Sequence, residues 1–194
     1  MKKTILLITL TTLCSSLAFA SGEGIYLGIN AIAGNIDLQD TTVGNQTYTP
    51  DSTSSPGGGL TVGYNVSENF ALDYAIDGFD QIDYSGDNAP NVSYWFTYLA
   101  AKPMLNIWKF NVFVEAGAAY VSFTQHNPDD VENTEGSGVR PFGGAGIGFN
   151  FSPNSELALS INRIEDTNTP ITFGMLTWTY HFTERYEDSG FLAD

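Results

Sequence analysis

Cysteine is almost missing from this 194-residue chain: Cys14 is the single one. It lies in a leader segment that we expect to be cleaved off, so the remaining chain has no thiol with which to form a disulfide. Stability must therefore come from packing and hydrogen bonding within one domain of ordinary size.

The leader has the three parts of a secretory signal peptide. Met1-Lys2-Lys3 is basic, an apolar run extends from Ile5 to Leu13, and Ala18-Phe19-Ala20 offers small residues for cleavage after Ala20. The apolar run is too short for a transmembrane helix. We therefore predict a signal peptide at 1–20, a domain at 21–182 and a short acidic tail at 183–194.

Basic residues are also scarce. Without Lys2 and Lys3, five of the seven basic residues remain against 22 acids, a net charge of −17. A nucleic-acid partner requires clustered Lys and Arg, and peripheral binding to anionic lipid requires a basic patch, so neither is expected. No motif for a cofactor or a catalytic metal is apparent.

Long apolar runs and helical periodicity are both missing after the leader. Instead, apolar residues alternate with small or polar ones in eight segments, as in β-strands. The predicted strands are 24–33, 58–66, 69–79, 92–103, 110–122, 139–151, 155–164 and 170–182.

The connections between these segments alternate in length. Tight turns are expected at 67–68, 106–109 and 152–154, long loops at 34–57, 80–91 and 124–138, and an intermediate connection at 165–169. Short turns at one end and long loops at the other are typical of an outer-membrane β-barrel.

The last segment, Pro170–Phe182, carries the most specific signal. Its closing Trp178-Thr179-Tyr180-His181-Phe182 places aromatics at alternate positions and ends on Phe. This pattern resembles the C-terminal insertion signal of bacterial outer-membrane barrels, here Trp178, Tyr180 and Phe182. The chain resembles the small OmpA-like, opacity-type family, although twelve residues follow Phe182. The resemblance implies an all-β fold: an eight-stranded antiparallel up-and-down transmembrane β-barrel in the outer membrane of a Gram-negative bacterium.

A soluble eight-stranded barrel such as a lipocalin would bury the apolar face instead. The membrane arrangement is favoured because the opposite face is rich in glycine, which suits the narrow interior of an eight-stranded barrel. These glycines are Gly59, Gly63, Gly144, Gly146 and Gly148. Aromatics near the segment ends, such as Tyr64 and Phe151, also match interfacial girdles.

Successive side chains of a strand alternate between its two faces, and this alternation places several charged side chains in the barrel interior. This predicted set of lumen charges is Asp73, Asp77, Lys102, Glu115, Arg140 and Glu156. An isolated buried charge is costly, so we expect Lys102 to pair with a nearby acid and help plug the barrel. The alternative is that these groups simply contact water in the lumen.

For function, the resemblance implies a non-enzymatic surface protein that supports the envelope, with acidic loops that interact with host cells or matrix. Its expected partners are outer-membrane lipid and lipopolysaccharide, and the barrel assembly machinery during insertion. Asp129, Asp130, Glu132 and Glu135 match no calcium-loop spacing, and loop 34–56 with Tyr48 is a possible adhesive surface.

Two alternatives stay open: a narrow channel for ions or small solutes, and a lipid A-modifying enzyme. The enzyme is disfavoured because Pro128 follows His126 by two positions, where the lipid A deacylase pattern has Ser.

Overall fold

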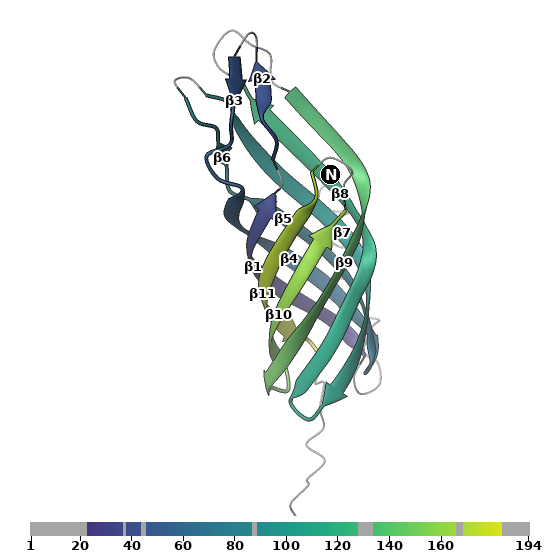
Figure 1. The fold of residues 1–194 in the computed structure, drawn as a ribbon. Coiled ribbons are helices and arrows are strands. Elements are labelled where there is room, and N and C mark those ends of the chain that lie inside the picture. Colours follow the sequence, from purple (N-terminus) through teal and green to yellow (C-terminus); the bar gives the residue numbers. More distant parts are fainter. Residues whose placement is uncertain are drawn as a thin grey trace, which may run out of the picture.

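The computed structural model describes residues 23–36, 38–43, 46–86, 89–127, 134–165 and 169–183. Eight long antiparallel strands form the wall of a barrel (Figure 1). Their bounds are β1 (Gly24–Ile36), β4 (Ser54–Ser67), β5 (Phe70–Phe79), β7 (Asn91–Ile107), β8 (Phe110–His126), β9 (Thr134–Ser152), β10 (Ser155–Ile164) and β11 (Ile171–His181). The predicted signal peptide, and the predicted tail beyond Thr183, lie outside the described residues.

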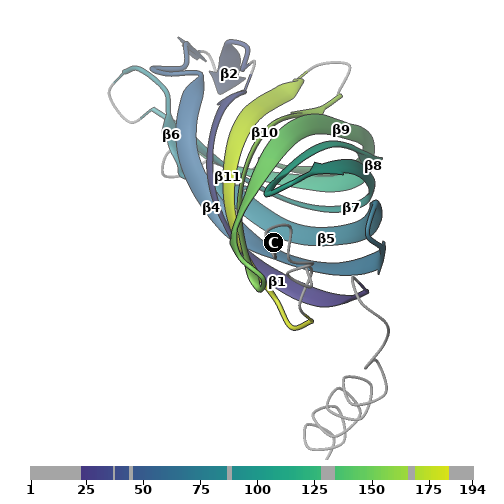
Figure 2. The same cartoon turned by 90° about the horizontal axis from the view of Figure 1, so that it is seen from below.

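Each strand pairs with its neighbours in the chain, and the first strand pairs with the last. β1 and β11 are joined along a register that runs from Tyr26↔His181 to Ile36↔Ile171, which closes the ring. Seen from below, the strands surround a single interior (Figure 2). Closure removes the free sheet edges that an open sheet of this size would leave.

Three two-residue turns join strands at one end of the barrel: Glu68–Asn69, Trp108–Lys109 and Pro153–Asn154. They are as short as expected, and Trp108 adopts a left-handed φ of 57°, which is rare for a bulky residue. In outer-membrane barrels the tight turns face the periplasm, so the opposite end is extracellular.

The extracellular segments contain more strand than predicted. β7, β8 and β9 all extend beyond their predicted limits, and the predicted loop 34–57 includes a small hairpin of β2 (Thr41–Val43) and β3 (Gln46–Tyr48). A further short strand, β6 (Ile82–Asp83), pairs with the start of β7. These polar segments have little hydrophobic alternation, but backbone pairing with a neighbouring strand is sufficient to order them.

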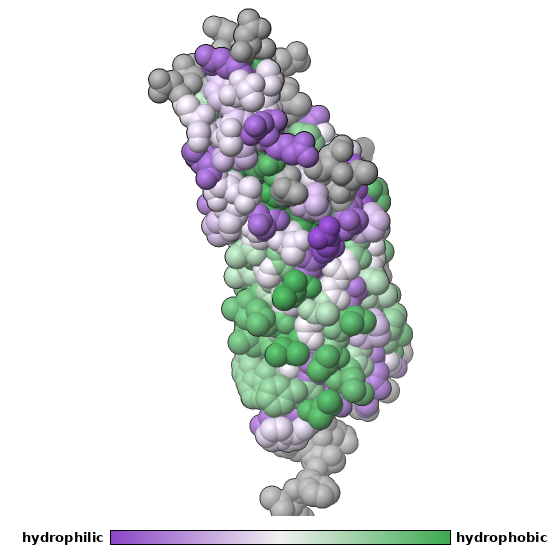
Figure 3. Space-filling view, viewed as in Figure 1, coloured by the Kyte–Doolittle hydropathy of each residue, from purple (hydrophilic) through white to green (hydrophobic). Residues whose placement is uncertain are grey.

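Alternation along the strands separates two faces, as predicted. Apolar residues such as Leu60, Ile76, Leu99 and Leu159 are 52–61% exposed on the outside, while their neighbours in sequence point inward. Exposed large apolar side chains come from all eight wall strands. On the face seen in Figure 3 they form a belt over the lower half, and the upper half is mostly hydrophilic. The described part of the chain contains no helix long and apolar enough to cross a membrane.

Aromatic pairs mark the two borders of this belt. Trp95 and Tyr120 contact at the upper border, with ring centroids 5.8 Å apart, and Phe110 and Phe149 contact at the lower border, at 5.1 Å. On β8, Phe110 and Tyr120 are ten positions apart, which matches the roughly 9–11 residues that a tilted strand needs to cross the bilayer. β8 continues to His126, well above the upper border.

Candidate functional site: the barrel interior and its extracellular mouth

The lower interior contains a network centred on Lys102. Its Nζ atom lies 3.4 Å from Asp73 Oδ2 and 3.7 Å from Glu115 Oε1. Tyr26 donates a hydrogen bond from its hydroxyl to Asp73 Oδ1, and Nζ also lies 4.3 Å from the centroid of the Phe113 ring. One cation therefore faces two carboxylates and an aromatic ring, which is the arrangement that makes burial of these charges tolerable.

The other predicted lumen acids accept hydrogen bonds from side-chain amides. Asn30 Nδ2 donates to Asp77 Oδ1 at 2.8 Å, and Asn111 Nδ2 donates to Glu156 Oε2 at 2.8 Å. Asp77 and Glu156 are 2% and 3% exposed. Asp77 Oδ2 has no hydrogen-bond partner within the described residues. Arg140, by contrast, lies higher, at the extracellular mouth.

A layer of aromatic side chains closes the interior above the polar network. Tyr98 and Phe142 are stacked with centroids 4.1 Å apart, and Phe96 and Phe173 are 5.2 Å apart. Phe79 contacts both Phe96 and Phe173. These rings come from β5, β7, β9 and β11, so they meet across the barrel and fill its cross-section.

Very little space remains below this layer. The cavity beside Lys102, Asp73 and Tyr98 has a volume of about 10 Å³, roughly the space that one water molecule needs. The described interior is therefore closely packed around Lys102, below the aromatic layer.

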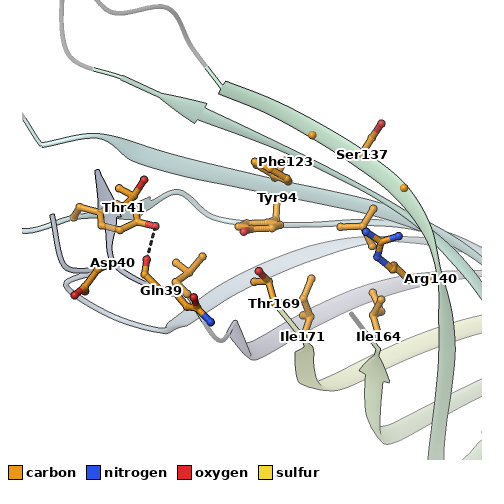
Figure 4. A pocket seen from close by; sticks show the side chains of 15 residues that line it. Gln39, Asp40, Thr41, Tyr94, Phe123, Ser137, Arg140, Ile164, Thr169 and Ile171 are labelled. Atoms are coloured by element: carbon orange, nitrogen blue, oxygen red, sulfur yellow. Dashed lines mark hydrogen bonds between the residues drawn. The ribbon is translucent and has the colours of Figure 1, made fainter. Parts of the chain in front are cut away.

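Above the aromatic layer lies a larger pocket of about 360 Å³ (Figure 4). Its floor is apolar and includes Ile164 and Ile171, and its wall includes the rings of Tyr94 and Phe123, which are 5.7 Å apart. Arg140 lines the same pocket. The pocket joins an apolar base to a polar rim, as small binding sites commonly do.

The segment before β2 forms the opposite rim of the pocket. Tyr84 donates a hydrogen bond to the Gln39 carbonyl oxygen at 3.5 Å, and Thr41 Oγ1 lies 3.5 Å from Gln125 Oε1. Burial, together with the carboxylate of Asp40, raises the pKa of Tyr84 above its ordinary value of 10.0. Tyr84 therefore remains a neutral hydrogen-bond donor at physiological pH.

Tyr48, in the segment between β1 and β4, is buried. Loop 34–56 is a candidate adhesive surface on its sequence, but Tyr48 within it is only 8% exposed and belongs to the same apolar cluster as Ile36 and Tyr94. Its hydroxyl donates to Gln46 Oε1 at 2.6 Å. The β2–β3 hairpin folds over the mouth, so a residue that looked available for binding instead helps to cover the core.

The structure also places the remaining candidates. Trp178, Tyr180 and Phe182 point to the lipid side at the periplasmic end and are 42–61% exposed; their role as an insertion signal stays a prediction. His126 ends β8, while Pro128 and the acids from Asp129 to Glu132 lie outside the described residues. Within the part of the chain that the structure describes, no group of three or more His, Cys, Asp or Glu is arranged to hold a metal ion.

The alternation along the strands predicts charged residues in the lumen, but none of their neutral partners is among the residues singled out from the sequence. Tyr26, Asn30 and Asn111 are each less than 5% exposed and take part in the polar network. The same alternation would have placed all three inside, because they alternate with Leu27, Ile29 and Val112. The mouth pocket had no comparable signal, since its lining comes from seven separate segments.

A closed antiparallel barrel with a lipid-facing apolar belt, aromatic borders and tight turns at one end is an integral outer-membrane barrel protein. The sequence matches the outer membrane protein beta-barrel domain over residues 5–182, and the chain belongs to this family. The search of curated proteins gave no match.

Several solved structures share the fold. Ail, the attachment invasion locus protein of Yersinia pestis, in complex with the heparin analogue sucrose octasulfate, is 15% identical with a TM-score of 0.61, covering 84% of this chain and 100% of Ail. Neisserial surface protein A is 12% identical with a TM-score of 0.57, covering 82% and 97%. OprG from Pseudomonas aeruginosa is 11% identical with a TM-score of 0.57, covering 84% and 97%. At these identities, the likeness concerns the fold alone.

Proposed function

We propose that this protein is a non-enzymatic surface protein that supports the envelope and presents its acidic extracellular end to a host-cell or matrix partner. The observation that carries the proposal is the contrast between a packed interior and a hydrophilic end that rises above the apolar belt (Figure 3). A barrel with about 10 Å³ of space beside its lumen cation offers little for transport, whereas its outer end offers an ordered, polar surface.

The charge of this end indicates what kind of partner suits it. The exposed acids there are Asp40, Asp51, Asp80, Asp83, Glu135 and Glu165. Among the described residues at this end, the cations are Arg140, which lines the pocket, and Arg163, which is paired with Glu165 at 2.5 Å. Ail was solved with a heparin analogue, but a sulfated polyanion is a poor match for this surface. We therefore expect a basic partner.

Adhesion of displayed cells tests this proposal. The mature chain is displayed on a non-adherent Gram-negative host, beside a variant in which Asp51, Asp80 and Asp83 are changed to Asn. The matched control is Glu68→Gln, which removes an exposed acid at the opposite, periplasmic end. Heat-dependent gel migration checks that all three fold.

We expect wild type and the Glu68 variant to adhere equally and the triple variant to adhere several-fold less, with wild-type adhesion weakening as salt rises. Equal adhesion of all three would contradict the charge argument, and no adhesion by any of them would contradict the interaction role.

The narrow-channel alternative is tested separately by single-channel recording in planar bilayers. Under the proposed function, wild type shows no resolved conductance, because the aromatic layer and the Lys102 network block the interior. Steady conductance steps in the wild-type barrel would favour the channel instead. Release of fatty acid from lipid A would favour the enzyme.

A further inference from the structure

The wall of the barrel is taller on one side than on the other. β8 and β9 remain paired up to Gln125↔Thr134, whereas β9 and β10 are paired only from Phe142↔Ile164 downward. The stretch of β9 from Thr134 to Pro141 is therefore held by β8 along one edge. β9 rises above the top of β10 in Figure 1.

The backbone geometry shows which groups face the open edge. Glu165 N donates to Pro141 O at 2.9 Å, so the carbonyl group of Pro141 points to the β10 side. In an antiparallel strand, alternate residues point to the same side. The N–H groups of Glu135, Ser137 and Val139 consequently face the open edge, and none has a hydrogen-bond partner within the described residues.

The inner face of this stretch borders the mouth pocket. Gly136 and Gly138 both line the pocket. A Cβ atom at Gly136 would overlap the Phe123 ring, and one at Gly138 would lie 2.8 Å from Arg140 Nη1. The lack of side chains at these two glycines lets the ring and the guanidinium lie flat against the strand. This edge of β9 and the apolar pocket thus adjoin each other.

We propose that the β10-side edge of β9 above Pro141, which is unpaired among the described residues, binds an extended basic segment of a partner protein as an added antiparallel strand, together with the mouth pocket. A row of outward N–H and C=O groups is matched by another peptide backbone. Side chains of the added strand alternate, so one set points inward over Ile164, Ile171 and Tyr94 and suits apolar residues. The other set points outward beside Glu135 and suits Lys or Arg.

The charge distribution selects this occupant over a second copy of the chain. Two β9 edges in antiparallel contact would bring together two surfaces that each carry exposed Glu135, within chains whose net charge without the leader is −17. Like charges across neighbouring strands are destabilising. The proposal rests on the proposed surface function and specifies how that surface recognises its partner.

A single substitution isolates the edge. Ser137→Pro removes an N–H that faces the open side and leaves the pairing with β8 in place, because proline is tolerated on edge strands. Ser137→Ala is the matched control, since it removes the exposed hydroxyl but keeps the N–H. The probe is a short fluorescent peptide that alternates lysine with valine, measured against each barrel in lipid nanodiscs.

We expect wild type and Ser137→Ala to bind the peptide equally and Ser137→Pro to bind it about tenfold more weakly. A tenfold weaker affinity corresponds to about 1.4 kcal/mol of binding free energy, which the loss of one hydrogen bond and the obstruction by the proline ring account for. Amide hydrogen exchange supplies an independent readout. Peptide should slow exchange at Glu135, Ser137 and Val139, while Gly136 and Gly138 are already protected by β8 in the free barrel.

Three results would overturn the proposal: no binding of the peptide to wild type, equal binding to Ser137→Pro, or slow exchange at the three edge amides before peptide is added. The last would mean that another segment of this chain covers the edge. If cells displaying Ser137→Pro adhere as well as wild type, the edge is not the recognition surface although the adhesive function stands. If no displayed barrel adheres, the surface function itself fails, whatever the peptide does.

Discussion

Lys102 is the group on which the polar interior depends most, and its removal gives the sharpest test of the packed lumen. Its ammonium lies between Asp73 and Glu115, whose side chains are 3% and 1% exposed, and is itself only 12% exposed. Changing Lys102 to Met keeps the length and the apolar stem of the side chain but leaves two buried carboxylates without a cation.

Removing one partner of a buried ion pair typically costs about 3–5 kcal/mol, because the remaining charge is desolvated without compensation. Here two acids lose the same cation, although Tyr26 still donates to Asp73. We expect Lys102→Met to lower the free energy of unfolding by about 3–5 kcal/mol. Urea titration of barrels in lipid vesicles, followed by tryptophan fluorescence, measures this.

Two further variants make the result specific. Arg163→Met removes a cation from a pair in which both side chains are more than half exposed, and its effect should be far smaller. The triple variant Lys102→Met, Asp73→Asn, Glu115→Gln removes all three charges and should recover most of the lost stability, since a neutral network avoids the desolvation cost. A Lys102→Met loss no larger than that of Arg163→Met would refute the reasoning.

The remaining predictions concern the aromatic layer, the unpaired acid and the lipid belt, each by the same unfolding measurement. Phe96→Ala should lower the free energy of unfolding by about 3–5 kcal/mol, because it leaves a cavity. Leu99→Ala, at a side chain that is 61% exposed on the lipid side, should cost much less. Equal losses would contradict the packing of the aromatic layer. Asp77→Asn should raise the free energy of unfolding by about 1 kcal/mol, because it replaces a buried carboxylate by a neutral amide. A clear loss of stability would mean that Oδ2 has a partner. Leu159→Arg should cost about 2–4 kcal/mol in mid-belt, whereas Val139→Arg, at a residue that pairs with Tyr120 at the upper border, should cost about 0–1 kcal/mol. The opposite order would contradict this placement of the membrane.

The alternation of residues within each strand was enough to predict the barrel and its two faces. Successive side chains of a strand point to opposite faces whatever the tertiary structure. Leu60, Ile76 and Leu159 accordingly point to lipid, and Asp73 and Glu115 point inward. Tight turns were equally readable, since they stand between strongly alternating segments.

Contacts across the barrel depend instead on how the strands are staggered when the ring closes. Strand alternation placed Lys102 among several acids, but only the register of β5, β7 and β8 brings its Nζ within 3.4 Å of Asp73 and 3.7 Å of Glu115. The registers of β8, β9 and β10 in turn bring Glu156 to Asn111. A shift of two residues along one strand would keep every side chain on its face and change each of these partners.

The extracellular end shows the same limit more strongly. Polar residues that lack alternation can form strands when a neighbour supplies backbone partners, so the heights of β8 and β9 could not be read from their own sequences. The burial of Tyr48 against Ile36 and Tyr94, and the difference in height between β9 and β10 beside the mouth pocket, likewise arise only when distant segments meet. Local sequence therefore determined which way each side chain of the membrane wall points, and the closed tertiary structure decided which side chains touch and how far each strand is paired.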